Sequence, residues 1–234
     1  MGALGNIKIS KFEYEEKVPS TGKRVTITPF RVGDEKVLLE ASQSEDVKHM
    51  QRAMKQVINN CVEGADVSEL ASFDMDYLFI KIRSRSVGET SEIGIKCKEC
   101  EAMNKITVNL DDLEVYKNPE HTRRVKIQDD LMFEMKYPDT YEMDITSESQ
   151  ADQIFEVIFH SLDKVYYGEE IIDVDAGDKE DVFTMLNQMN KDQFAKVQTF
   201  FETMPKLKKD VTFTCGSCNT ENEYELEGLQ SFLS

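Results

Sequence analysis

The sequence predicts an α+β fold in which a helical core carries short β-hairpins. Along several segments, apolar residues recur at intervals of three and four, which is the pattern of amphipathic helices. Shorter segments alternate between apolar and polar residues, and two of these surround Cys-x-x-Cys pairs. The order strand, helices and cysteine pair occurs twice along the 234 residues, so we also expect an internal duplication.

The first half, residues 1–117, contains the first copy of this order. Its predicted elements are a strand over 24–30 and helices near 34–41, 46–62 and 74–87. Gly88 ends the third helix, since glycine adopts the left-handed conformation that often follows a helix. Cys61 lies on the apolar face of the second helix, so we expect it to be a buried core residue without a ligand role.

The second half, residues 118–234, repeats the order with one additional helix. Its predicted elements are strands over 125–127 and 132–137, an irregular segment over 166–173, and helices near 149–163, 178–189 and 191–204. Pro205 ends the last helix, because proline cannot continue the helical hydrogen bonding. The helix near 178 corresponds to an 18-residue insertion relative to the first half.

Length and charge limit the classes of partner. With 40% hydrophobic and 31% charged residues, the composition is that of a globular chain. The 45 acidic and 28 basic residues give a formal charge of -17, which disfavours nucleic-acid phosphates and anionic lipid. A neutral or basic protein is the expected partner. No apolar stretch is long enough to span a membrane, and Met1–Ser10 lacks the pattern of a signal peptide, so we expect a cytosolic protein.

Four of the five cysteines form two pairs with the same spacing. Cys97 and Cys100 make one Cys-x-x-Cys, and Cys215 and Cys218 make the other. Alternating apolar residues lead into and out of each pair, which predicts two strands joined by a tight turn. The two segments align without a gap at an offset of 118, so that Asn222 falls on Asn104.

These four cysteines predict a single structural zinc ion. A Cys-x-x-Cys on a hairpin turn directs two sulfurs to one side, and two such knuckles facing each other supply a tetrahedral four-thiolate site. That site leaves no open position for water, so the metal would have a structural role without hydrolytic activity. Two alternatives remain: hairpins that hold no metal, and a redox dithiol. The dithiol is disfavoured because both flanks of each pair are strand-like.

The offsets between the two halves support the predicted duplication. The matched pairs are Val57 with Val157, Ile58 with Ile158, Asp74 with Asp192, and Cys97 with Cys215. The first two pairs have an offset of 100 and the last two an offset of 118, which the 18-residue insertion explains. The alternative is that helical and strand periodicity alone produces the alignment.

No pattern of catalytic residues stands out. The three histidines, His49, His121 and His160, lack a partner pattern, and neither a dinucleotide-binding nor a phosphate-binding loop occurs. We therefore predict a protein without enzymatic activity, with an uncharacterised enzyme as an alternative. A zinc-ribbon module that binds nucleic acid is another alternative, because basic residues gather near Arg83, at 123–126 and at 206–209. The net charge disfavours that alternative.

Several segments together indicate a family. They are Ile27-Thr-Pro-Phe30, Val37-Leu-Leu-Glu-Ala-Ser42, Asn60-Cys-Val62, Asp76-Tyr-Leu-Phe-Ile-Lys-Ile-Arg83, Ser86-Val-Gly88, Glu134-Met-Lys-Tyr-Pro138, Val165-Tyr-Tyr-Gly-Glu169, Phe201-Glu-Thr-Met-Pro205 and the stretch from Tyr224 to Phe232. In their order and spacing the chain resembles the baseplate hub proteins of T-even-type tailed bacteriophages, the phage base plate protein family. The resemblance covers nearly the whole length.

This resemblance implies a phage tail protein that is present in the host cytoplasm during assembly and then in the tail baseplate. It implies a structural or assembly role in the baseplate hub, from which the tail tube and sheath grow. Other hub proteins or the tape measure protein are the implied partners, with no membrane involved. An assembly chaperone for the tape measure protein that is not retained in the virion is the competing description. The zinc site is argued from the four cysteines alone and is not carried over from the family.

Overall fold

The computed structural model describes residues 12–44, 46–139, 141, 143, 145–147 and 149–233. Within these residues lie six α-helices and twelve β-strands in small sheets, which confirms the predicted α+β class. Met1–Ser10, where the sequence lacks a signal-peptide pattern, lies outside the described residues. No described helix has the length and apolar character needed to cross a membrane.

The chain divides into two compact units, each of which is described by itself. Unit 1 comprises residues up to Val115 together with those from Leu207 onward, and unit 2 is Tyr116–Lys206. The first boundary lies beside the predicted one between residues 117 and 118. The second cysteine pair, however, lies in unit 1 with the first pair, although it belongs to the predicted second half.

Unit 1 combines a small sheet, three helices and two long hairpins. Its elements are β1 (Tyr14–Lys17), β2 (Arg24–Ile27), α1 (Val32–Ser42), α2 (Val47–Cys61), β3 (Val62–Glu63), η2 (Val67–Glu69), α3 (Ser72–Ser86), β4 (Thr90–Lys96), β5 (Met103–Asn109), β6 (Glu114–Tyr116), β11 (Lys206–Thr214), β12 (Glu221–Glu227) and η4 (Leu229–Phe232). Strands β1, β2 and β3 form one sheet, and β6 extends the β11–β12 pair on the side of β11.

The core of unit 1 lies where helices α2 and α3 pack together. On α2, Val57 and Ile58 are fully buried because the apolar residues recur on one face of the helix. Leu78 and Ile82 of α3 are also fully buried. Cys61 is 2% exposed at the end of α2, which confirms the predicted core position.

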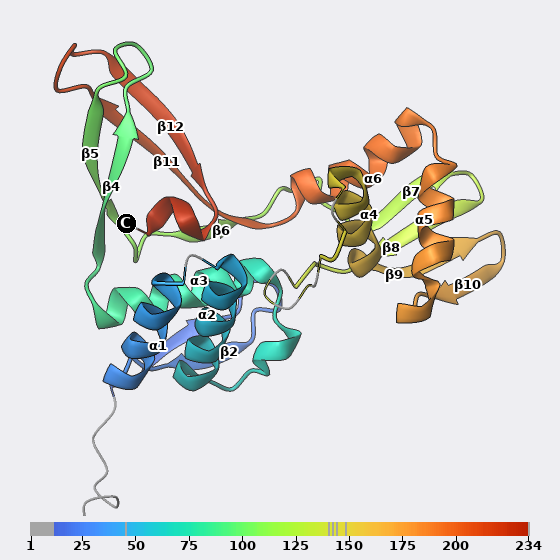
Figure 1. Ribbon diagram of the computed structural model, residues 1–234, viewed down its shortest axis with the longest axis horizontal. Coiled ribbons are helices and arrows are strands. Elements are labelled where there is room, and N and C mark those ends of the chain that lie inside the picture. The colour runs from blue at the N-terminus through green and yellow to red at the C-terminus, as the bar shows by residue number, and fades with distance from the viewer. Residues whose placement is uncertain are drawn as a thin grey trace, which may run out of the picture. The chain divides into compact units, whose positions relative to one another are not determined.

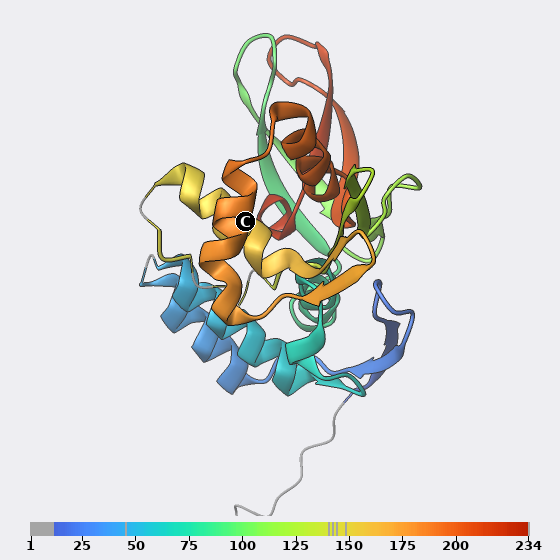
Figure 2. The same cartoon turned by 90° about the vertical axis from the view of Figure 1, so that its right-hand side faces the viewer.

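The two hairpins of unit 1 have the same register as each other, as their alignment at an offset of 118 predicts. Strands β4 and β5 pair with Ile93 opposite Ile106, and β11 and β12 pair with Val211 opposite Tyr224, so the offset of 118 holds for both strands. Along β4, buried and exposed residues alternate without interruption. Figure 1 shows the two hairpins side by side with their turns at the same end, and Figure 2 shows the same arrangement from a second side.

Unit 2 is a four-stranded sheet with three helices. Its elements are β7 (Arg124–Gln128), β8 (Leu131–Met135), α4 (Gln150–Ser161), β9 (Leu162–Tyr167), β10 (Glu170–Asp173), η3 (Ala176–Asp178), α5 (Lys179–Asn187) and α6 (Lys191–Thr203). The strand order is β10-β9-β8-β7. All three helices contribute to one apolar cluster with the sheet, in which Phe133 of β8, Leu186 of α5 and Phe200 of α6 are almost completely buried.

Two strand regions differ from the prediction. Residues 166–173, expected to be irregular, form the β9–β10 hairpin, with Gly168 in the turn at φ +59°. All four residues of β10 are exposed, so no alternation of apolar and polar residues marked this strand. No element was predicted before residue 24, where strand β1 lies, for the same reason: three of the four residues of this strand are exposed.

The order of elements recurs in the two halves of the sequence. In the first half, α2 ends at Cys61 and β3 follows at once, pairing Val62 with Ile27 of β2. In the second half, α4 ends at Ser161 and β9 follows at once, pairing Leu162 with Met135 of β8. In each half a further helix then leads into a cysteine hairpin. This recurrence supports the duplication, which stays a prediction.

A buried carboxylate links two parts of unit 2. The side chain of Glu156 on α4 is 0% exposed. Its oxygens accept hydrogen bonds from the backbone N–H of Thr146 at 2.9 Å, the hydroxyl of Thr146 at 2.8 Å and the backbone N–H of Ser147 at 3.2 Å. The ammonium group of Lys179 on α5 pairs with the same carboxylate. Glu156 thus ties the segment before α4 and the start of α5 to α4.

We expect Glu156→Gln to destabilise unit 2 in a pH-dependent way. Burial raises the pKa of Glu156, but the hydrogen bonds from Lys179 and Thr146 outweigh that effect and lower the pKa to about 2, from an ordinary value of 4.5. The unfolded carboxyl group therefore binds a proton first as the pH falls. The stabilisation by Glu156 is complete above about pH 4.5 and is lost as the pH falls toward 2.

Urea unfolding at a series of pH values measures this effect. At pH 7 the variant should lose about 1–3 kcal/mol of unfolding free energy, since buried donors lose a charged acceptor. The difference from the unmodified protein should shrink between pH 4.5 and pH 2. Glu180→Gln, an exposed position on α5, is the control and should change little. A Glu156→Gln deficit that does not change with pH would contradict this account.

Candidate metal centre

The four paired cysteines meet at the turns of the two unit 1 hairpins. Their sulfur atoms all lie within 4.8 Å of one another. Cys97 and Cys215 are buried, whereas Cys100 and Cys218 lie toward the surface. Among the described residues, this is the one group of three or more histidine, cysteine or acidic side chains close enough together to hold a metal ion.

The sulfur positions fit a tetrahedral ion of the size of zinc. A Zn–S bond of about 2.3 Å in tetrahedral geometry places neighbouring sulfurs about 3.8 Å apart. The sulfurs of Cys97 and Cys218 are 3.7 Å apart, as are those of Cys100 and Cys215. Both distances join one hairpin to the other, so an ion at the centre would link the hairpins.

The two turns have the same backbone structure. In the first, the N–H of Cys97 donates to the carbonyl of Ala102 and the N–H of Glu101 donates to the carbonyl of Cys97. In the second, Cys215 and Asn219 make the same two bonds, the former to Thr220. Glu101 and Asn219 both adopt left-handed backbone angles, at φ 57° and 58°. This backbone conformation directs the backbone N–H groups of each turn toward the sulfur of its first cysteine.

These amides favour the thiolate form of the first cysteine in each pair. The backbone N–H groups of Cys218 and Ser217 lower the pKa of Cys215 to about 6. The backbone N–H of Cys100 likewise lowers the pKa of Cys97. The turns therefore prepare one thiolate in each hairpin for a cation.

Cys100 behaves differently because it lies close to other sulfurs. The N–H of Ala102 lowers its pKa, but hydrogen bonding with the thiols of Cys218, Cys215 and Cys97, together with burial, raises it to about 12. Four sulfurs at this separation cannot all ionise unless a positive charge lies between them. The donor set therefore suits a divalent ion that binds thiolates.

Two asparagines for which the sequence predicts no role also contact the sulfurs. The amide nitrogen of Asn222 lies 3.4 Å from the sulfur of Cys97, and that of Asn104 lies 3.7 Å from the sulfur of Cys215. Each asparagine is seven residues after the first cysteine of its own pair. In the sequence, the one indication of a shared role for these two asparagines is that they align with each other at the offset of 118.

The histidines lie apart from the cysteine cluster. His49 contacts the hydroxyl of Ser44, and His121 contacts the hydroxyl of Thr203 while its ring packs against Phe200. The ring of His160 lies against Phe159. Burial lowers the pKa of both His121 and His160. In the described part of the chain, none of the three belongs to a metal-binding group.

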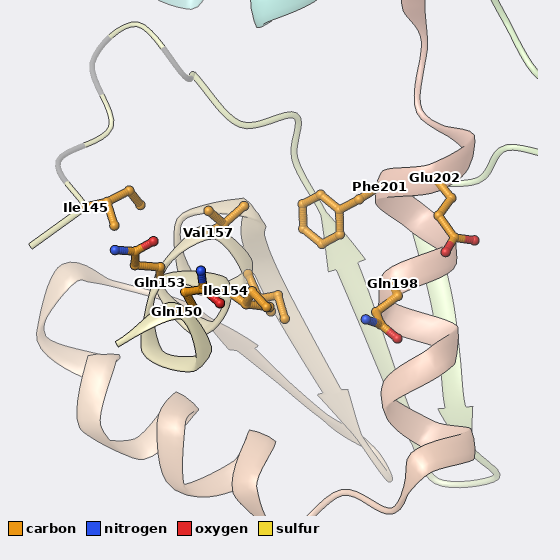
Figure 3. Close-up of a pocket in the computed structure, with 9 residues that line it drawn as sticks. Ile145, Gln150, Gln153, Ile154, Val157, Gln198, Phe201 and Glu202 are labelled. Carbon is orange, nitrogen blue, oxygen red and sulfur yellow. The ribbon is translucent and has the colours of Figure 1, made fainter. Parts of the chain in front are cut away.

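An apolar groove lies in unit 2 between α4 and α6. It has a volume of about 850 Å³. Figure 3 shows Phe201 of α6 pointing toward Ile154 and Val157 of α4 across it. Its polar lining residues are Gln150, Gln153, Gln198 and Glu202. Three amides and a single carboxylate do not form a nucleophile–base set, so this groove presents contact surface without an evident catalytic group.

Comparison with known proteins gives one match. A family model described as T4 bacteriophage base plate protein matches residues 9–234. The match covers nearly the whole chain, including both units and all four paired cysteines. No curated protein and no solved structure matches the chain.

Proposed function

Because the chain belongs to the T4 bacteriophage base plate protein family, we propose that it is a structural component of the hub at the centre of the phage tail baseplate. The observation that carries this proposal is the family match over residues 9–234. We propose that the protein acts through contacts with other proteins and catalyses no reaction.

We further propose that one structural zinc ion is held by Cys97, Cys100, Cys215 and Cys218. The sulfur separations of 3.7 Å and the amides directed at Cys97 and Cys215 support this assignment. Four protein ligands complete a tetrahedral shell, so the ion would stabilise the fold and would leave no position for a reacting water. The ion would join hairpins whose cysteines are 115 positions apart in the sequence.

The proposed partners are other hub proteins or the tape measure protein of the tail. The formal charge of -17 supports a partner with a neutral or basic surface and opposes binding to nucleic acid. The protein would be present in the host cytoplasm during assembly and then in the tail of the virion. The zinc-ribbon alternative loses support because the basic residues at 206–209 lie in β11, which pairs with a β12 strand that carries four glutamates.

Mass spectrometry of purified virions tests the hub assignment. We expect peptides from both units at a few copies per particle, because a hub component is retained in the finished tail. An abundant protein of the infected lysate that is not part of the virion, measured in the same sample, is the control for carry-over. Absence from virions together with abundance in the infected lysate would contradict the hub assignment and would support an assembly chaperone.

A further inference from the structure

We propose that Asn104 and Asn222 are positioning residues of the four-cysteine site, each fixing the cysteine turn of the opposite hairpin. This inference rests on the proposed metal site. It concerns side chains that are not ligands themselves, and it follows from a set of contacts that occurs twice in the structure.

Asn222 of β12 reaches the turn of the first hairpin. Its side-chain oxygen accepts the backbone N–H of Lys98 at 2.9 Å, and its amide nitrogen lies 3.4 Å from the sulfur of Cys97. The same nitrogen donates to the carbonyl of Thr220 in its own turn at 2.9 Å. The residue is 3% exposed, so these bonds are shielded from water.

Asn104 of β5 makes the same contacts in the reverse direction. Its side-chain oxygen accepts the backbone N–H of Gly216 at 3.0 Å, and its amide nitrogen lies 3.7 Å from the sulfur of Cys215. That nitrogen also donates to the carbonyl of Ala102 at 2.8 Å. Lys98 and Gly216, like the two asparagines, are related by the offset of 118.

The backbone partners fix the orientation of both amide groups. A backbone N–H can only donate and a backbone carbonyl can only accept, so the oxygen must face Lys98 or Gly216 and the nitrogen must face Thr220 or Ala102. The remaining N–H of each amide then points at the sulfur. Each side chain therefore places a hydrogen-bond donor on a thiolate of the other hairpin and holds the turn that carries it.

Such contacts have three consequences for the site. A donor directed at a thiolate stabilises its negative charge. The hydrogen bond from the asparagine oxygen to the backbone N–H of the residue after the cysteine holds that cysteine in place. Because the contacts run in both directions, they also set the spacing between the hairpins before an ion binds. Asparagine suits this role because its side chain combines an acceptor and a donor, with no charge of its own.

The two asparagines should not contribute equally. Asn222 is 3% exposed, and its amide nitrogen lies 3.4 Å from the sulfur of Cys97. Asn104 is only half-buried and lies farther from its sulfur. We therefore expect the larger effect at Asn222.

The test measures metal affinity in the full-length protein. Zinc affinity is determined by competition with a chromophoric chelator, and Co²⁺ is added to report ligand geometry through its absorption bands. We expect Asn222→Ala to weaken zinc binding by about 10- to 100-fold, the range for residues that orient metal ligands, and to change the Co²⁺ spectrum. Asn104→Ala should change both in the same direction by less.

Asn109→Ala is the matched control. Asn109 is an exposed asparagine of β5, the strand of Asn104, and its side chain accepts one backbone N–H, that of Asp111 at 3.0 Å. The separation of five positions between Asn104 and Asn109 corresponds to about 17 Å along the strand. We expect this variant to keep the zinc affinity and the Co²⁺ spectrum of the unmodified protein.

The variant Asn222→Asp distinguishes the contact with the Cys97 sulfur from the hydrogen bond to the backbone N–H of Lys98. Aspartate keeps the acceptor for the N–H of Lys98 but replaces the donor near Cys97 with a carboxylate oxygen. We expect zinc binding to be weakened at least as much as by alanine. Restored affinity in Asn222→Asp would overturn the proposal, because the contact with the sulfur would then be dispensable.

The outcomes also separate this inference from the metal site itself. If the unmodified protein binds zinc and both alanine variants bind it equally well with unchanged Co²⁺ spectra, the positioning role is wrong and the metal site stands. If the unmodified protein binds neither metal, the proposed site fails and this inference fails with it. Circular dichroism of each variant before the titration identifies any loss of fold.

Discussion

Replacement of Cys215 by serine is expected to abolish zinc binding and to unfold the paired hairpins of unit 1. Cys215 is 0% exposed, and its sulfur lies 3.7 Å from that of Cys100. Removing one of four thiolates leaves an incomplete shell around the ion. Structural zinc contributes on the order of 10 kcal/mol to the folding of small domains, so its loss should exceed the effect of most core substitutions.

Metal analysis and hydrogen exchange measure this prediction together. Protein purified without chelator should hold about one zinc per chain, as expected for a closed structural site, and Cys215→Ser should hold almost none. Amides in β4, β5, β11 and β12 should lose protection in the variant, and in the unmodified protein after chelation. Zinc well below one equivalent in protein never exposed to chelator would refute the metal site.

Cys61→Ser is the control for this experiment. Cys61 is another buried cysteine of unit 1, but it lies at the end of α2 and is not in the cysteine cluster. We expect the full zinc content to be retained in this variant, with at most a modest loss of stability. Equal loss of zinc in both variants would show that general unfolding, and not loss of a ligand, releases the ion.

The second large effect is expected in unit 2, where Phe200→Ala should cost about 3–5 kcal/mol of unfolding free energy. Phe200 is 2% exposed. The centre of its ring lies 5.2 Å from that of His121 and 6.0 Å from that of Tyr137. Truncation to alanine therefore removes buried apolar surface from the helix–sheet cluster and leaves a cavity that the rigid sheet cannot close.

Phe201→Ala is the comparison for this measurement. The two phenylalanines are adjacent on α6, but Phe201 is only partly buried and lines the apolar groove. Chemical denaturation followed by the fluorescence of the tyrosines should give a clearly smaller loss for Phe201→Ala. Losses of the same size would mean that burial in the cluster does not determine stability here.

The sequence predicted best those elements that bury one face. The strands of the two cysteine hairpins carry apolar residues at alternating positions, and their predicted common offset of 118 agrees with the structure. Helices α2 and α3 carry apolar faces and lie close to the expected bounds. In these elements the order of apolar and polar residues directly predicts which side chains are buried.

Elements without a buried face could not be predicted in this way. Strand β10 is exposed along its whole length, and β1 carries mainly polar residues, so both depend on backbone pairing with a neighbouring strand. Backbone hydrogen bonds leave no trace in the side-chain pattern. The side-chain pattern therefore predicts an irregular segment over 166–173, although Gly168 marks the turn of the β9–β10 hairpin.

The candidate site was predictable in its four cysteines but not in the two asparagines that contact them. The spacing of the cysteines identified all four members of the cluster. Asn104 and Asn222 align with each other in the sequence, but an asparagine in a strand can be exposed to solvent or bonded to many different partners. Only the structure shows that each side chain reaches the opposite hairpin.

The place of the second hairpin in unit 1 has a consequence for protein synthesis. Cys100 and Cys215 are 115 positions apart, and a ribosome takes on the order of ten seconds to add that many residues. The first cysteine hairpin leaves the ribosome before Cys215 and Cys218 have been made, and the whole of unit 2 is translated between the two hairpins. Capture of the proposed ion would then follow translation of unit 2 and of the second hairpin.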